Sequence, residues 1–311
     1  PVLPRVLAVI PVLVVASILV FVAMRVLPGD PVTVLAQGAP LSVEQRAALT
    51  RQYHLDEPIP VQYASWVGDA VTGDLGRSLK SNRPVTDVIV EALPRTVVLL
   101  LGGFAVSLLL AVPLGLVAAL REGGVVDHLV IGLTMFLFSV PLFISGVLAI
   151  YLFAYRWGVL PSFGFGSDEG VLSVFKHMLL PWLTLGLSLL AVQTATLRAA
   201  LVDVFNQEYV RMAESRGLPW LHVLRRHALR SALVPVVTLL GLQLSYMVIG
   251  SVFVDYIFGV GGFGTVLVDA VKFRDLTVVQ AAVMLVSAFF VLANLAVDLV
   301  AARLDPRYAI R

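Results

Sequence analysis

The sequence predicts an all-α, polytopic membrane protein with six transmembrane helices. The first observation is composition: 59% of the residues are hydrophobic and 14% are charged, whereas a soluble domain has about half apolar and about a quarter charged residues. The second is a mean hydropathy of +0.94. The third is a series of apolar runs of about twenty residues, which is the length that crosses a ~30 Å hydrocarbon layer. Such runs favour helices over barrel strands, because a spanning segment must satisfy its backbone polar groups internally.

The apolar runs give the expected spans in order. They lie at about 6–27, 96–120, 128–154, 178–201, 232–254 and 278–302. The first run is longer than a signal-peptide core and lacks a small-residue cleavage pattern, so we expect it to be retained as a helix. Close helix packing is expected at small residues, among them Gly102, Gly103 and Gly186. Kinks are expected at Pro113, Pro141 and Pro181, unless Pro181 begins its helix.

The distribution of basic residues predicts the orientation, because lysine and arginine gather on the cytoplasmic side of short connections. One set of helix ends holds Arg5, Arg121, Arg198, Arg211, Arg216, Arg225, Arg226, Arg230, Arg303, Arg307 and Arg311. The opposite short loops hold only Arg156, Lys176, Lys272 and Arg274. We therefore expect both termini to be cytoplasmic. The chain then divides into a first transmembrane helix (1–27), an extracytoplasmic segment (28–95) and a five-helix core (96–311).

The extracytoplasmic segment is expected to form a small helical subdomain. Ser42–Gln45 resembles a helix cap ahead of a short helix over Arg46–Tyr53. A second helix is expected over Val61–Val71, closed by Thr72-Gly73-Asp74. A segment of about 65 residues with few large apolar groups buries little surface alone, so we expect it to pack on the outer ends of the membrane helices.

The sequence contains no motif for catalysis, cofactor binding or metal binding. A P-loop requires a glycine-rich turn that ends in Gly-Lys-Ser/Thr, and that context is missing at Lys80, Lys176 and Lys272. The histidines show no His-Glu-x-x-His or comparable ligand spacing, and the chain has no cysteine. We therefore predict no catalytic, cofactor-binding or metal-binding residues, no ATPase activity in this chain and no binding of nucleic acid.

A basic segment between the fourth and fifth runs predicts a two-helix elbow. A helix that starts at Glu208 ends at Gly217, which can adopt the left-handed conformation of a helix end, and Pro219 suits the first turn of the next helix. The second arm covers about 220–230 and places on one stripe Leu221, Leu224 and Ala228. Such an elbow can dock into a groove on a soluble partner.

Motifs spread over almost the whole chain resemble those of one permease family. They are Leu27–Pro31, Leu55–Tyr63, Gly73–Ser78, Tyr209–Leu218 with Arg226–Pro235, Phe258–Gly264, Asp298–Val300 and Leu304–Arg307. Together they resemble the permeases of binding-protein-dependent ABC importers, specifically the dipeptide and oligopeptide branch, and the elbow resembles their EAA coupling loop. The general pattern begins with Glu and Ala, whereas here Arg211 and Met212 align with these positions. A basic first residue is common in the peptide branch.

This resemblance implies a type I ABC importer permease fold in the bacterial cytoplasmic membrane, with a coupling loop at about 202–231. It implies that this loop couples the chain to the ATPase through Tyr209, Arg211, Ala213, Gly217, Leu218, Leu221, Leu224 and Arg226. The implied partners are a second, homologous permease subunit in a heterodimer, two ABC ATPase subunits that bind ATP and Mg²⁺, and an extracytoplasmic solute-binding protein. The implied function is import of dipeptides or oligopeptides by alternating access.

Polar residues inside the fourth and fifth runs have two interpretations. They are candidate pathway-lining residues, because polar side chains within spans turn inward or face water; the set comprises Gln193, Thr194, Gln243, Ser245 and Tyr246. The alternative is interhelical hydrogen bonding, which contributes about 1 kcal/mol per bond.

Other functions stay open on the sequence alone. Within the same permease branch, nickel chelates, glutathione and haem-like compounds are alternative solutes. An intramembrane enzyme would require a catalytic set in the spans, such as a Ser-Lys dyad or paired aspartates, and the runs contain neither. A channel is disfavoured because it has no use for an energy-coupling elbow.

Overall fold

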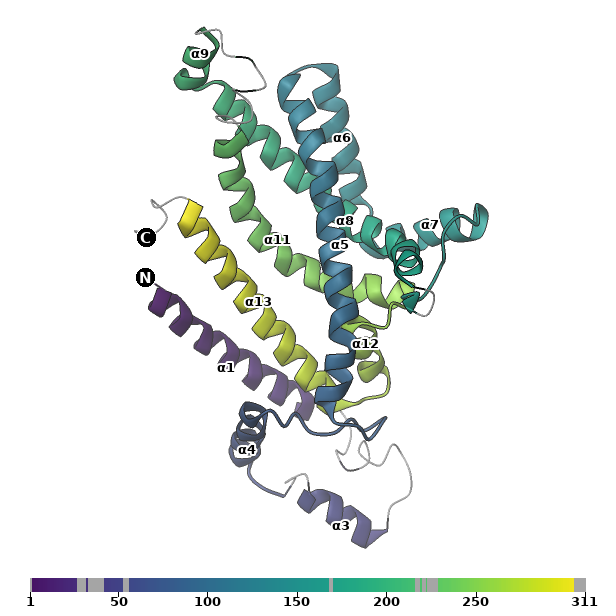
Figure 1. Cartoon of the computed structure of the whole chain (residues 1–311). Coiled ribbons are helices and arrows are strands. Elements are labelled where there is room, and N and C mark those ends of the chain that lie inside the picture. Colours follow the sequence, from purple (N-terminus) through teal and green to yellow (C-terminus); the bar gives the residue numbers. More distant parts are fainter. Residues whose placement is uncertain are drawn as a thin grey trace. The chain divides into compact units, whose positions relative to one another are not determined.

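The computed structural model describes residues 2–26, 32, 42–52, 56–167, 170–215, 219, 222 and 229–304, and this part of the chain is mainly helical (Figure 1). Among these residues the only β-type pairing is an isolated bridge between Arg77 and Pro84. The all-α prediction is therefore confirmed. The helices form two compact units, the first built mainly from residues 95–261 and the second from residues 3–94 and 262–291.

The first unit is organised around the long helix α8 (Val171–Phe205). Its packing partners are α11 (Leu229–Phe258), α6 (Val125–Ser139) and α7 (Leu142–Ala149). Buried apolar side chains at the centre of this unit include Leu99, Met178, Leu185, Met247 and Phe258. Because these residues come from α5 (Val85–Leu120), α8 and α11, one core joins three helices that are distant in sequence.

Close packing at a small residue is evident where α5 meets α8. A Cβ atom on Gly102 would overlap the Trp182 side chain, so only glycine leaves room for the indole. Trp182 Nε1 donates a hydrogen bond to the Val98 carbonyl oxygen at 3.0 Å. One turn of α5 thus holds the partly buried indole and gives its N–H a hydrogen-bond partner.

The third expected span is bent rather than straight. α6 ends at Ser139, Val140 is extended with φ −79° and ψ 122°, and Pro141 precedes α7. α7 continues into the π-helix η1 (Ile150–Arg156), and the combined helix Leu142–Arg156 is bent by 95° relative to α6. Proline lacks an N–H donor and keeps the residue before it extended, so α6 cannot continue through Val140. The expected kink at Pro141 is confirmed, whereas Pro181 lies inside α8 and does not begin it.

The described residues support fewer spans than the six expected. α5 and α8 are each long and apolar enough to cross a membrane. Two bent pairs raise the number to at most four: α6 with α7 and η1, and Tyr246–Phe258 with α12 (Phe263–Lys272). Shorter apolar stretches, Pro11–Ala23 and Leu276–Leu292, lie in α1 (Val2–Val26) and α13 (Leu276–Leu304). A total of six spans stays a prediction.

In the second unit, the two helices expected between the first and second spans are both present. α3 (Val43–Gln52) begins with a reciprocal cap, in which Ser42 N–H donates to Gln45 Oε1 at 2.9 Å and Gln45 N–H donates to Ser42 Oγ at 3.1 Å. α4 (Ile59–Thr72) ends at Gly73, whose φ of 91° is left-handed. Both end signals were local in the sequence, and both predictions are confirmed.

α4 packs against α1 through aromatic side chains. The Phe21 ring lies 5.3 Å from the Tyr63 ring and 5.7 Å from the Trp66 ring, measured between centroids. The Ser17 and Tyr63 hydroxyl groups are hydrogen-bonded at 2.7 Å. These contacts hold α4 on α1, and packing of the segment on the outer ends of the membrane helices stays a prediction.

The motif Gly73–Ser78 ends in a buried hydrogen-bond cluster around Asp275, which we call the Asp275 clasp. Ser78 Oγ donates to Asp275 Oδ2 at 2.5 Å, and Lys80 N–H donates to the same oxygen at 3.2 Å. Asp275 Oδ1 accepts a hydrogen bond from Val278 N–H at 3.3 Å and so caps the start of α13. One carboxylate therefore fixes the loop ahead of α5 to the first turn of α13.

Candidate functional site

The expected coupling loop begins directly where α8 ends. Gln207 N–H donates to the Val204 carbonyl oxygen at 3.0 Å, which closes the end of α8, and α9 (Glu208–Ser215) follows. Val210 is only 1% exposed and packs against Val204. Exposed side chains of α9 include Tyr209 at 40% and Met212 at 55%, with Glu208 and Ser215 at its two ends. Among the side chains described in α9, Val210 therefore anchors the helix on α8, and Tyr209 and Met212 present an aromatic and a thioether group to the surroundings.

The predicted coupling residues are only partly described. Tyr209, Arg211 and Ala213 all lie in α9. The other five lie outside the described residues: Gly217, Leu218, Leu221, Leu224 and Arg226. The first arm of the elbow is thus present as a helix, while its glycine break and its second arm stay predictions.

Two of the candidate pathway residues lie together between α8 and α11. Gln193 Nε2 donates to Gln243 Oε1 at 2.8 Å, and both side chains are buried. In the described part of the chain, Gln193 Oε1 and Thr194 Oγ1 have no hydrogen-bond partner although they are buried. Tyr246 is 71% exposed, and the Ser245 side chain lies outside the described part. The Gln193–Gln243 bond joins two helices, as the alternative interpretation of interhelical hydrogen bonding expects. That these residues line a pathway stays a prediction.

An ion pair that the sequence did not single out joins α6 to α8 ahead of the coupling helix. Arg198 Nε lies 2.9 Å from Asp127 Oδ1, and Arg198 Nη2 lies 2.6 Å from Asp127 Oδ2. Asp127 Oδ2 also accepts a hydrogen bond from Gly123 N–H at 3.0 Å. The side chains are 27% exposed for Arg198 and 6% for Asp127. Since Arg198 lies about two turns before the end of α8, this bidentate pair fixes the helix that carries α9.

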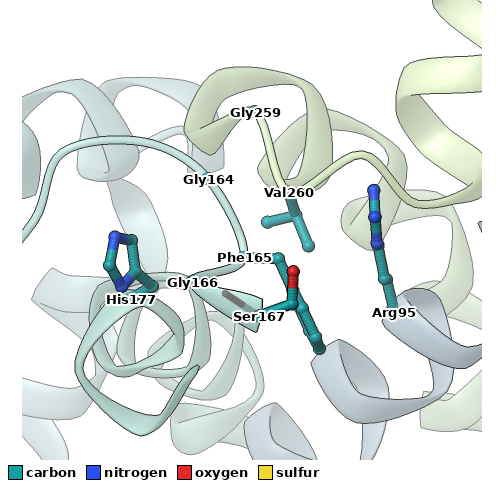
Figure 2. Close-up of a pocket in the computed structure, with 8 residues that line it drawn as sticks. All are labelled: Arg95, Gly164, Phe165, Gly166, Ser167, His177, Gly259 and Val260. Atoms are coloured by element: carbon teal, nitrogen blue, oxygen red, sulfur yellow. The ribbon is translucent and has the colours of Figure 1, made fainter. Parts of the chain in front are cut away.

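A pocket of ≈ 410 Å³ lies in the first unit, at the loops that precede α8 and follow α11. Figure 2 shows His177 and Arg95 on opposite sides of it, with Phe165, Ser167 and Val260 between them. Its lining is completed by three glycines, Gly164, Gly166 and Gly259. The two loops are tied together, because Gly164 N–H donates to the Phe258 carbonyl oxygen at 2.9 Å.

Backbone contacts hold both nitrogen-bearing side chains of this pocket. Arg95 Nη1 donates to the Gly261 carbonyl oxygen at 3.2 Å, and the guanidinium carbon lies 5.8 Å from the centroid of the Phe165 ring. His177 Nδ1 lies 2.9 Å from the Ser173 carbonyl oxygen. A carbonyl only accepts hydrogen bonds, so Nδ1 carries the hydrogen.

The chain as a whole matches two family descriptions. Residues 111–310 match the binding-protein-dependent transport system inner membrane component, and residues 2–100 match the N-terminal component of the same kind of system. The chain belongs to this family of binding-protein-dependent transport permeases. The motifs of the dipeptide and oligopeptide branch are thus confirmed as a sign of membership, and the protein is an ABC importer permease subunit of the membrane.

Relatives of similar length carry several solute names. A probable peptide ABC transporter permease of Sinorhizobium fredii is 35% identical over 98% of both chains. The glutathione transport system permease GsiC of Escherichia coli K12 is 35% identical over 98% of this chain and 97% of its own. The dipeptide transport system permease DppB of the same strain is 32% identical over 98% and 97%.

A solved structure of an inward-facing MetNI methionine ABC transporter superposes with a TM-score of 0.59. It covers 70% of this chain and 96% of the other, at 16% sequence identity. At this identity the likeness concerns the fold alone, and it confirms the expected fold of an ABC importer permease.

Proposed function

We propose that this permease subunit imports peptide-like solutes, as one of two different permeases of an importer in the cytoplasmic membrane. The observation that carries the proposal is full-length similarity to permeases named for peptides, dipeptides and glutathione. Glutathione is itself a short peptide, so the three names share one chemistry. Two ATPase subunits that bind ATP and Mg²⁺, and an extracytoplasmic solute-binding protein, complete the proposed assembly, with both termini of this chain in the cytoplasm.

The proposed mechanism is alternating access driven through the elbow. α9 follows α8 after a short turn and is held on it by Val210, so a displacement of α9 is passed to α8. α8 in turn shares its core with α5 and α11. Tyr209 and Met212 are among the exposed side chains of α9 that an ATPase subunit would contact. Movement of the docked elbow would then rearrange α8 and α11, the two helices that it connects.

The decisive experiment is reconstitution with candidate partners. The chain is co-expressed with a second permease and two ATPase subunits, and the purified complex is placed in lipid nanodiscs. We expect ATP hydrolysis to rise when a loaded solute-binding protein is added, and we expect the isolated chain to hydrolyse no ATP. Hydrolysis by the isolated chain, or a complex that forms without any response to loaded binding protein, would contradict the proposal.

Gly217→Val is expected to uncouple transport from ATP hydrolysis. A β-branched residue adopts the left-handed conformation only at a cost of about 1 to 3 kcal/mol, and the cheapest relief is to redirect the second arm of the elbow. The variant should reach the membrane in normal amounts but import little solute, as measured by uptake at equal membrane abundance. Gly217→Asn is the matched control, because asparagine tolerates this conformation, and it should keep most of the uptake. Unchanged uptake in Gly217→Val would show that the elbow does not carry the coupling.

A further inference from the structure

We propose that the pocket between Arg95 and His177 binds the carboxylate of a small solute, while Phe165 and Val260 pack against the apolar part of that solute. This inference rests on the proposed import function, for which it supplies a solute site. The pocket lies apart from the Gln193–Gln243 pair, which is buried between α8 and α11.

The Arg95 side chain has donors to spare and is held in place. Its guanidinium carries five N–H donors, and among the described residues it makes one hydrogen bond to the protein, from Nη1 to the Gly261 carbonyl oxygen. That bond and the nearby Phe165 ring orient the planar group. A guanidinium held in this way matches the two oxygens of a carboxylate and distinguishes it from a neutral amide.

Glycines shape the pocket around these two side chains. A Cβ atom on Gly261 would lie 2.5 Å from Arg95 Nη1, and one on Gly166 would overlap the imidazole of His177. Both glycines have positive φ, 75° and 72° respectively. The backbone can therefore lie against the charged group and the imidazole without a side chain filling the space. The glycine-rich motif after α11 thus leaves room for the Arg95 side chain.

Size and charge both favour a small anionic solute. The volume of ≈ 410 Å³ falls within the roughly 300 to 1,000 Å³ of small-molecule sites, and it exceeds what one carboxylate fills. No acidic residue lines the pocket within the described part of the chain. The exposed Lys176 is adjacent in sequence to His177 and adds positive charge. A solute with a carboxylate next to an apolar side chain, as at the end of a short peptide, satisfies these requirements.

A protection experiment tests this assignment directly. The chain has no cysteine, so Ser167→Cys places a single thiol in the pocket lining. The reconstituted complex, without binding protein, is labelled with an impermeant thiol reagent in the presence of N-acetylphenylalanine or its neutral amide. We expect the acid, at ten times its Kd, to slow labelling about tenfold by mass action, and we expect the amide at the same concentration to have little effect.

Arg95→Gln, added to Ser167→Cys, should raise the Kd of the acid at least about tenfold, because it removes a charge-assisted pair of hydrogen bonds. The same acid concentration should then slow labelling about twofold or less. Arg156→Gln is the matched control: Arg156 is an exposed arginine of η1 that does not line the pocket, and its loss should leave protection intact. Equal protection by acid and amide, or protection that survives Arg95→Gln, would overturn the carboxylate assignment. No protection by either probe would overturn the site itself.

Two further measurements test other occupants of the pocket. Asp168 and Glu169 follow Ser167 and lie outside the described residues. If the acid protected the thiol only in the variant that also carries Asp168→Asn and Glu169→Gln, a carboxylate of the chain itself would be the partner of Arg95. The proposal would then be wrong. Protection of the introduced thiol by solute-free binding protein, but not by the acid, would assign the pocket to protein docking instead. ATP hydrolysis stimulated by loaded binding protein is measured on the same preparation. A normal response with no protection rejects the pocket alone, whereas a missing response rejects the proposed function.

Discussion

Replacing Arg198 with leucine is expected to lower the free energy of unfolding by about 3 to 5 kcal/mol, because it leaves the carboxylate of Asp127 buried without its partner. The Asp127 side chain is only 6% exposed, and both of its oxygens receive a guanidinium nitrogen. One hydrogen bond, from Gly123 N–H, would remain. Denaturant titration of the purified chain in detergent micelles, followed by tryptophan fluorescence, measures the loss.

The double variant Asp127→Leu with Arg198→Leu should recover most of this stability, since a buried ion pair replaced by apolar residues is often neutral. Arg83→Leu is the matched control. Arg83 also forms a two-point pair with a carboxylate, Glu91, but those side chains are 48% and 65% exposed, so its loss should lower the free energy of unfolding far less than the loss of Arg198. Additive losses in the double variant would show that the two side chains act independently and that the pair is not the source of the stability.

Features with local signals were predicted well from the sequence. The cap at Ser42 and the left-handed end at Gly73 each depend on a few neighbouring residues, so α3 and α4 were both predicted with boundaries shifted by at most three residues. The kink at Pro141 was visible for the same reason, because proline acts on its own N–H and on the residue before it. α12 was missed. Its ten residues follow directly on a glycine-rich turn that resembles a loop.

Contacts between distant segments were not predictable in this way. The pair of Arg198 with Asp127 spans 71 positions, and Arg95 reaches Gly261 across 166. Periodicity identifies which residues are apolar, but it does not say which helix faces which, so charged partners on different helices stay unmatched. Arg198 counted only toward the positive-inside pattern. The available signal for the pair was a charged residue at each of two apolar runs: Arg198 lies inside the fourth run, and Asp127 directly precedes the third.

Asp275→Ala is expected to lower the free energy of unfolding by about 2 to 4 kcal/mol, combining the loss of a helix cap with buried donors left unpaired. Asp275 is 2% exposed, and its carboxylate receives hydrogen bonds from Ser78 Oγ, Lys80 N–H and Val278 N–H. Loss of the clasp frees both segments at once. Hydrogen exchange should therefore quicken in residues 76–85 and in the first turn of α13.

Asp269→Asn tests whether the order of α13 depends on the buried Asp275 clasp or only on the negative charge carried by aspartates in and next to α12. Asp269 lies 3.7 Å from Lys80 Nζ, and these side chains are 42% and 46% exposed, so the substitution should cost less than about 1 kcal/mol. Lys80 also lies over the Phe273 ring at 3.6 Å, a contact that this variant leaves in place. If Asp269→Asn quickened exchange in α13 as much as Asp275→Ala, the ordering of this region would depend on net charge. If only Asp275→Ala quickened exchange in α13, the order of this region would depend on the clasp. The Gly73–Ser78 motif would then serve to place Ser78 against the carboxylate that caps α13.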